Sequence, residues 1–283
     1  MSLVSINEIL NKAKNSDYAV PGFNFYTYEE AYQIVKAAND LNSPVILMAT
    51  GSCVEHLGLD LIVQIAKKLA FEFDNIPIAI HLDHATDQNT IYKAMKAGFT
   101  SVMFDGSLLP IEENINKTKE VVKVGKALGV SVEAEIGRVG KGEEGEDIGE
   151  VLTDPEVAKN FYEKTKVDAL AVAIGTVHGM QKQEAKLHFD LAEKISNLID
   201  VPLVLHGSSG VKDNEMKRII KTRFSKINIG TRLKRAYADG IKDYIKNHPD
   251  EKAALNIIKK GSQELHKVVR QKIQLLNSPN QAK

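Results

Sequence analysis

The chain has little of several residue types, and each shortage excludes a class of protein. Of its 283 residues only Cys53 is a cysteine, which excludes an internal disulfide framework and fits a reducing compartment. The 37 basic residues balance 37 acidic ones, so no basic excess indicates a nucleic-acid partner. No apolar run reaches membrane-spanning length, and the first ten residues lack the pattern of a signal peptide. We expect a cytoplasmic protein that binds neither nucleic acid nor membrane.

Short apolar segments typical of buried strands alternate with segments of helical periodicity along the whole chain. The expected strands lie in 18–25, 44–50, 77–83, 101–105, 130–136, 169–177, 201–205 and 226–229. The expected helices are 5–15, 28–41, 59–73, 88–97, 112–128, 154–165, 189–198, 213–222, 231–247 and 251–276.

Eight strands that are each followed by a helix predict a closed (β/α)8 TIM barrel. We expect one domain over residues 1–283, with extra terminal helices; a doubly wound open sheet is the alternative. Such barrels carry their chemistry at the carboxyl ends of the strands. The polar residues expected there are Asn24, Thr50, Asp83, His84, Asp105, Glu135, His178, His206 and Asn228.

Three of the expected strands end in a histidine, namely His84, His178 and His206. Three neutral imidazoles that converge on one point make a zinc site with an open fourth position. The alternative is that each histidine caps its strand with an ordinary hydrogen bond. The other histidines fit no pattern and are interpreted as ordinary; they are His56, His81, His188, His248 and His266.

Carboxylates accompany these histidines. Asp83 and His84 are adjacent, so both can face the barrel axis only if the strand bends or ends there. Asp83 is then a general acid or base beside the metal, or a carboxylate that orients a ligand. Asp105 and Glu135 fit a second metal position, an orienting role or a buried hydrogen-bonded pair. Glu133 is interpreted as structural.

Three loops at the same end of the barrel are rich in small or polar residues. Residues 207–210 (GSSG) and 228–231 (NIGT) follow the last two strands, where backbone N–H groups suit a phosphate. The alternative is two ordinary tight turns. Residues 137–149 carry five glycines and four acids, which fits a solvated loop or a lid that brings a carboxylate to the substrate.

Several motifs give the chain a resemblance to a known family. They are VPGFN at 20–24, HLDH at 81–84, SVMFD at 101–105, SVEAE at 131–135, GTVHG at 175–179, LVLHG at 203–207 and KIN at 226–228. Over about residues 4–276 the chain resembles the class II, zinc-dependent ketose-bisphosphate aldolases. The resemblance implies reversible cleavage of fructose or tagatose 1,6-bisphosphate to dihydroxyacetone phosphate and glyceraldehyde 3-phosphate.

The resemblance also implies roles for individual residues. Zinc is expected on His84, His178 and His206, and Asp83 is expected to handle the proton of the C4 hydroxyl. Glu143 falls on the family's loop glutamate that moves the C3 proton, or Glu144 if the loop is shifted by one. Substrate contacts are expected from Asn24, Thr50, Gly179, Lys182, Gly207, Ser208, Ser209, Asn228, Ile229, Gly230 and Thr231. A monovalent cation, Na⁺ or K⁺, is expected on the carbonyls of Val177, Gly179 and Gly207.

The chain departs from the family pattern at three places. Ala85 follows the HLDH motif where His or Gly is frequent, and 140–143 reads GKGE rather than beginning Gly-Gly. Gly230 stands where fructose-type members carry Asp or Asn and tagatose-type members a small residue. We therefore predict an enzyme that accepts both epimers.

The resemblance further implies an assembly. We expect a homodimer or homotetramer, with a non-catalytic companion subunit if the enzyme is of the tagatose type. The basic residue for the distal phosphate comes from the C-terminal region of a neighbouring subunit in this family, where Lys259 or Lys260 fits.

Competing functions make different demands on the sequence. A Schiff-base aldolase needs a lysine at the carboxyl end of a strand, and Lys166 and Lys226 are both expected to precede their strands. A zinc hydrolase often uses a His-x-His pair, which the chain lacks. A non-catalytic sugar-phosphate-binding subunit would lose the acid/base or a ligand, and the chain retains all of them.

Overall fold

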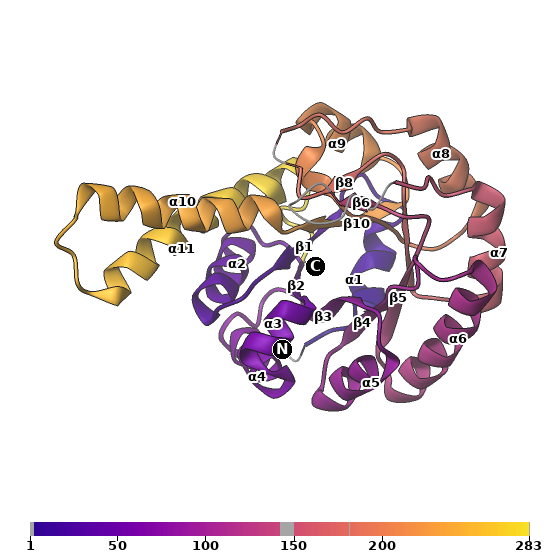
Figure 1. Ribbon diagram of the computed structural model, residues 1–283, viewed down its shortest axis with the longest axis horizontal. Coiled ribbons are helices and arrows are strands. Elements are labelled where there is room, and N and C mark those ends of the chain that lie inside the picture. The colour runs from indigo at the N-terminus through magenta and orange to yellow at the C-terminus, as the bar shows by residue number, and fades with distance from the viewer. Residues whose placement is uncertain (1–2, 142–149, 181, 283) are drawn as a thin grey trace.

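The computed structural model describes residues 3–141, 150–180 and 182–282. In this part of the chain eight parallel strands close into a barrel in the order β1-β10-β9-β7-β5-β4-β3-β2 (Figure 1). The predicted TIM barrel is therefore confirmed. The barrel strands are β1 (Val20–Asn24), β2 (Val45–Ala49), β3 (Ile78–Ala85), β4 (Ser101–Phe104), β5 (Ser131–Ile136), β7 (Ala169–Val172), β9 (Leu203–Leu205) and β10 (Phe224–Ile229).

Each barrel strand is followed by a helix on the outside of the barrel (Figure 1). Helix α4 illustrates why, because Ile62, Ala66 and Leu69 recur at helical spacing and bury one face against the sheet. The eight helices are α2 (Tyr28–Asp40), α4 (Leu59–Glu72), α5 (Gln88–Ala97), α6 (Ile111–Leu128), α7 (Pro155–Thr165), α8 (Phe189–Leu198), α9 (Asp213–Ile219) and α10 (Thr231–Asn247).

The barrel interior is apolar at one end and polar at the other. Helix α1 (Ile6–Ala13) packs Ile6 and Leu10 against Val20, Ile46 and Ala169, which lie at or near the start of their strands. This cluster closes the amino-terminal end of the barrel. Further along the strands the inward positions are polar, so the functional groups gather at the carboxyl end.

The expected strand over 169–177 was wrong in its second half. Strand β7 ends at Val172, and the chain then turns at Gly175, which has φ +107°. A Cβ there would collide with the carbonyl oxygen of Lys186, so only glycine fits. His178 instead lies in the two-residue strand β8 (Val177–His178), which pairs with β6 (Gly140–Lys141) outside the barrel.

Two short elements at the carboxyl end of the barrel were not expected from the sequence. Helix α3 (Gly51–Leu57) follows β2, and the 3₁₀ turn η1 (Ser208–Gly210) follows β9. Both lie directly after barrel strands, at the carboxyl end.

Helices α10 and α11 (Ala254–Leu275) form a hairpin that projects from the barrel (Figure 1). Two glycines lie where the helices meet: a Cβ on Gly261 would lie 3.0 Å from the carbonyl oxygen of Tyr237, and one on Gly240 would lie 3.2 Å from that of Lys260. The other end of α11 packs against α2. Among the described residues, no helix is both long and apolar enough to cross a membrane.

Candidate metal centre

A cavity of about 690 Å³ opens at the carboxyl ends of the strands. Most of the residues predicted from the sequence line it: Asn24, Thr50, Asp83, His84, Asp105, Glu135, His178, Gly179, His206, Gly207, Ser208, Ser209, Asn228, Gly230 and Thr231. Lys182 is exposed and does not line it, and Ile229 lines a neighbouring cavity instead. Glu143 and Glu144 lie outside the described residues.

Three histidines from different elements meet in this cavity. One ring nitrogen from each of His84, His178 and His206 lies within 4.8 Å of the others. The ring centroids are 5.1 Å apart for His84 and His178, and 4.5 Å apart for His84 and His206. The three rings are inclined steeply to one another, so their nitrogens point toward a shared space rather than stacking.

His84 is held by a carboxylate on its outer nitrogen. Its Nδ1 lies 2.9 Å from Oδ2 of Asp105, the residue after β4, so Nδ1–H donates. Nε2 then carries a lone pair in the neutral ring and a second hydrogen in the protonated ring. Burial alone lowers the basicity of the ring, but the charge of Asp83 and the hydrogen bond to Asp105 raise the pKa of His84 to about 10. The site therefore attracts positive charge.

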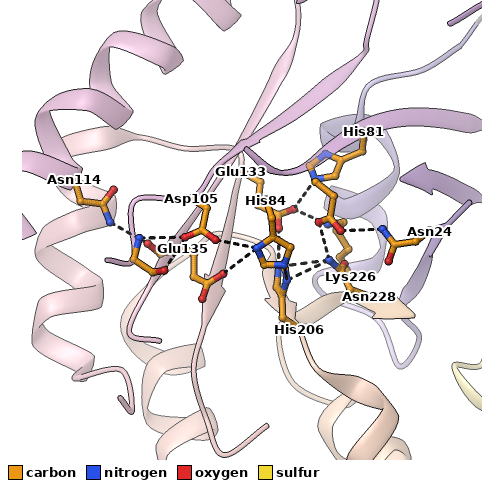
Figure 2. A network of polar contacts seen from close by, with 12 residues as sticks. Asn24, His81, His84, Asp105, Asn114, Glu133, Glu135, His206, Lys226 and Asn228 are labelled. Carbon is orange, nitrogen blue, oxygen red and sulfur yellow. Dashed lines mark hydrogen bonds and ion pairs between the residues drawn. The ribbon is translucent and has the colours of Figure 1, made fainter. Parts of the chain in front are cut away.

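His206 is also held by a carboxylate, that of Glu133. Its Nε2 lies 3.0 Å from Oε1 of Glu133, and its Nδ1 lies 2.8 Å from Nε2 of His84 (Figure 2). With Nδ1 of His84 and Nε2 of His206 donating to carboxylates, the facing nitrogens of the two rings would both present lone pairs if both rings were neutral. Two lone pairs at this distance repel each other unless a proton or a metal ion lies between them, so the donor set fits a metal cation.

Asp83 and His84 reach the cavity together because the strand bends between them. His84 has φ +53°, and the pairing of β3 with β4 shifts register between Leu82 and Ala85. The predicted bend is confirmed. A left-handed backbone costs energy at a residue other than glycine, and here it lets two polar residues in succession reach the cavity.

Asp83 is buried and held by two amides. Asn24 Nδ2 donates to its Oδ2 over 2.9 Å, and Asn228 Nδ2 donates to its Oδ1 over 3.2 Å. Burial raises the pKa of a carboxyl group, but the positive charges of His84 and Lys226 hold the pKa of Asp83 below its usual range. The carboxylate is thus an oriented anion beside the histidines.

The pKa values of Asp105 and Glu135 shift in opposite directions. The hydrogen bond from His84 outweighs burial and holds the pKa of Asp105 below its usual range, whereas burial raises the pKa of Glu135. Glu135 Oε2 lies 3.9 Å from His84 Nδ1, and His84, Asp105 and Glu135 form a second group with metal-ligand spacing. Asp105 therefore makes a direct hydrogen bond with His84, whereas Glu135 lies too far from the same nitrogen for one.

The two predicted phosphate loops lie side by side. Ser208 Oγ donates to the carbonyl oxygen of Asn228, which ties η1 to the end of β10. Gly207 packs directly against the backbone of Val177. Helix α10 begins at Thr231, so its free N–H groups open beside Ser209 at the cavity wall.

Gly230 has a local role that its position in the loop did not reveal. A Cβ on residue 230 would lie 2.6 Å from Oδ1 of Asn24. The glycine therefore leaves room for the amide that holds Asp83.

Sequence reasoning missed a buried polar group beneath the histidines. His81 was interpreted as ordinary, yet it is fully buried with Nδ1 2.7 Å from Ser101 Oγ. Lys226 was expected to precede its strand, but it lies within β10, fully buried and 2.8 Å from Glu133 Oε2. The sequence did contain a sign of this group. Residues 81, 133 and 226 each lie two positions before a predicted site residue on the same strand (Asp83, Glu135 and Asn228), so their side chains face the same side of the sheet. Arg138 and Lys234 also line the cavity and were not singled out.

Residues 4–281 match the family model described as fructose-bisphosphate aldolase class-II. The chain belongs to the class II fructose-bisphosphate aldolase family. As a class II aldolase it is an enzyme, a lyase that performs aldol cleavage of a ketose bisphosphate, as the sequence predicted.

Individual relatives of this class II aldolase agree with the family match. It is 39% identical over 284 residues to the D-tagatose-1,6-bisphosphate aldolase subunit GatY of Klebsiella oxytoca, covering 99% of this chain and 100% of that protein. The crystal structure of the YdjI aldolase from Escherichia coli K12 has a TM-score of 0.87 at 32% identity, covering 99% of this chain and 100% of that one.

A more distant solved structure has the same fold. It is a putative fructose-1,6-biphosphate aldolase from Coccidioides immitis, with a TM-score of 0.86 at 27% identity. The match covers 97% of this chain and 96% of that one. The class II aldolase is therefore similar to these proteins over essentially its full length, hairpin included.

Proposed function

We propose that this class II aldolase cleaves its ketose 1,6-bisphosphate with a zinc ion held by His84, His178 and His206. The observation that carries the proposal is the convergence of three ring nitrogens within 4.8 Å, with Nε2 of His84 and Nδ1 of His206 2.8 Å apart and a carboxylate behind each of these two rings. When bound, zinc supplies Lewis-acid stabilisation of the negative charge that develops beside the C2 carbonyl. Asp105 orients His84, and the group formed by His84, Asp105 and Glu135 is a candidate second metal position.

Asp83 is proposed as the group that accepts the proton of the C4 hydroxyl. Its two oxygens are fixed by Asn24 and Asn228, so the carboxylate is oriented before the substrate arrives. Glu143, on the loop after β5, is proposed to move the proton at C3. The described ends of that loop support its place beside the site, because β6 pairs with β8, which carries His178.

The phosphate nearest the ketone is proposed to bind where η1 and the start of α10 meet. Gly179, Gly207, Ser209 and Thr231 line the cavity there. Ser208, Asn228, Ile229 and Gly230 complete the two loops, Asn24 and Thr50 line the cavity near by, and Lys182 is proposed to approach once substrate is bound. A monovalent cation, Na⁺ or K⁺, on the carbonyls of Val177, Gly179 and Gly207 would neutralise the same phosphate.

Both epimers at C4 are proposed as substrates. Fructose and tagatose bisphosphates differ only in the configuration of the hydroxyl that Asp83 handles. Gly230 offers no side chain that would read it, and a relative at 39% identity is named for tagatose bisphosphate. One lost hydrogen bond changes discrimination by about 1–3 kcal/mol. A ratio of kcat/KM above about a hundredfold for fructose bisphosphate would contradict this interpretation.

For the assembly we propose a homodimer or homotetramer in the cytoplasm. The projecting hairpin supports it, because Lys259 and Lys260 lie on α11 and do not line the cavity of their own chain, so a basic residue from this hairpin would have to serve a neighbouring subunit. The description of the GatY relative as a subunit supports a companion protein. Molecular mass in solution, with and without such a companion, tests both statements.

The burial of Lys226 disfavours a Schiff-base mechanism. It has no solvent exposure and is paired with Glu133, so its amine is neither free nor open to a substrate carbonyl.

The catalytic proposal is tested by Asp83→Asn, which keeps the shape of the side chain but cannot take up a proton. We expect turnover to fall by about 10²–10⁴-fold with zinc still bound. Turnover near that of the wild type would remove Asp83 from the proposed role.

A further inference from the structure

Beneath the metal centre lies a layer of charged groups that the proposed reaction does not use. His81 on β3, Glu133 on β5 and Lys226 on β10 point into the barrel, and none has any solvent exposure (Figure 2). Barrel interiors are normally filled with branched apolar side chains at this level. A buried ion pair adds little to stability compared with apolar residues of the same volume, so stability does not explain it.

Glu133 divides its two oxygens between different partners. Oε2 lies 2.8 Å from Nζ of Lys226, and Oε1 lies 3.0 Å from Nε2 of His206. A carboxylate carries no hydrogen, so Nε2 of His206 must donate. Nδ1 then keeps its lone pair and faces the other histidines. The amide nitrogen of Asn228 lies 3.3 Å from Nδ1 and 3.5 Å from Nε2, so the contact with Glu133 and not the one with Asn228 sets the tautomer.

Lys226 prevents a competing arrangement. Nε2 of His81 is buried 3.7 Å from Oε2 of Glu133 and has no hydrogen-bond partner among the described residues. Without the ammonium group, the carboxylate can rotate toward His81, which would free Nε2 of His206. The lysine therefore decides which of two histidines receives the carboxylate.

We propose that Lys226 and Glu133 are positioning residues: the lysine holds the carboxylate, and the carboxylate fixes the tautomer of His206 so that Nδ1 faces the metal. The inference rests on the metal role proposed for His206. It assigns to the ion pair a function in metal affinity rather than in contact with substrate. Partners of this kind behind a metal ligand typically contribute about 10–100-fold to metal affinity.

The test uses the full chain and two readouts other than activity. In metal-free protein labelled with ¹⁵N-histidine, the ring shifts of His206 report which nitrogen carries the hydrogen. Competition with a chromophoric chelator gives the zinc dissociation constant. In the wild type we expect Nε2–H on His206. In Lys226→Met we expect a mixture of tautomers and zinc affinity weakened by about 10–100-fold.

Two further variants keep the test decisive. Lys226→Met leaves Glu133 as an unpaired buried charge, which disfavours folding, so Lys226→Met/Glu133→Leu removes both charges and the hydrogen-bond acceptor together. This double variant is expected to fold and still bind zinc at least tenfold more weakly. Lys272→Met is the matched control, because Lys272 is also largely buried beside a carboxylate, 3.7 Å from Asp213, but it does not line the metal cavity. It should keep wild-type zinc affinity.

The outcomes separate this inference from the proposed function. Nδ1–H on His206 in the wild type, or wild-type zinc affinity in the folded double variant, would overturn the positioning role even if the enzyme cleaves its substrate. Zinc binding and the Nε2–H tautomer without cleavage of either bisphosphate would overturn the proposed reaction and leave the positioning role standing.

Discussion

Single residues in this aldolase do work that their type alone does not reveal. Asp83 and His84 both reach the cavity because His84 accepts a left-handed backbone, and Asn24 can hold Asp83 because residue 230 has no side chain. The strained backbone of His84 and the missing side chain at Gly230 have the same effect. Both bring polar groups of neighbouring strands into one small volume.

The role of Gly230 leads to a prediction for Gly230→Ala. The added Cβ would lie 2.6 Å from Oδ1 of Asn24, so the amide must move and its 2.9 Å hydrogen bond to Asp83 is lost. A hydrogen bond to a charged group is worth about 1.5–3 kcal/mol, so we expect kcat to fall by about tenfold or more. Zinc content should not change.

Asn24→Ala provides the control for that experiment. If both substitutions act through the same hydrogen bond, Gly230→Ala should cost little more in a chain that already carries Asn24→Ala. Independent, additive losses would show that Gly230 acts on something other than Asn24.

At the scale of elements, the hairpin of α10 and α11 depends on the absence of side chains at its crossing. In Gly261→Val, the new side chain would meet the carbonyl oxygen of Tyr237, which lies 3.0 Å from the position of a Cβ. Overpacking of this kind costs about 1–3 kcal/mol and should lower the melting temperature by about 2–6 °C.

Gly51→Ala is the control for the hairpin, since a Cβ there would meet nothing within 4 Å. Its melting temperature should stay at the wild-type value or rise slightly. Equal loss of stability in both variants would rule out the close helix approach as the cause.

The loop over 137–149 contains Glu143, the residue proposed to transfer the proton at C3. Glu143→Ala should lower turnover by about 10²–10⁴-fold, because one carboxylate that transfers a proton is typically worth that much, while zinc stays bound. Glu144→Ala is the matched control and should remain near wild type. The opposite result would show that the proton-transfer role belongs to Glu144.

Most elements could be predicted from the sequence because both faces of a parallel barrel strand are buried, and such strands are continuous apolar runs. The same rule failed at 169–177, where Ala173 and Ile174 are buried in a turn rather than in a strand. An apolar sequence indicates that a segment is buried, but it does not show that the segment pairs with a neighbouring strand. Gly175 was the one local sign of the turn.

The charged layer of the site was harder to predict for a different reason. A lysine in an apolar run indicates a strand boundary, since unpaired charges are rarely buried. Lys226 is buried because Glu133 lies across the barrel, 93 residues earlier in the chain. Only the closed topology brings the two together, and a local pattern cannot contain that information.

On the scale of the whole molecule, the residues that pack the barrel core and the residues of the candidate site lie at opposite ends of the barrel. The apolar cluster with α1 fills one end, and the histidines, carboxylates and phosphate loops occupy the other. The histidines come from β3, β8 and the end of β9, so the metal centre exists only when the barrel is closed. We expect metal binding and global folding to be linked, with the zinc-loaded protein the more stable form.

A metal on the three histidines is proposed to be required for aldol cleavage. The most direct measurement is the release of dihydroxyacetone phosphate from fructose and tagatose bisphosphates before chelation, after chelation and after the return of zinc. We predict loss of cleavage on chelation, recovery with one zinc per chain, and no covalent adduct when substrate is treated with borohydride. Full cleavage by the stripped protein, or a borohydride-trapped lysine adduct, would contradict the account.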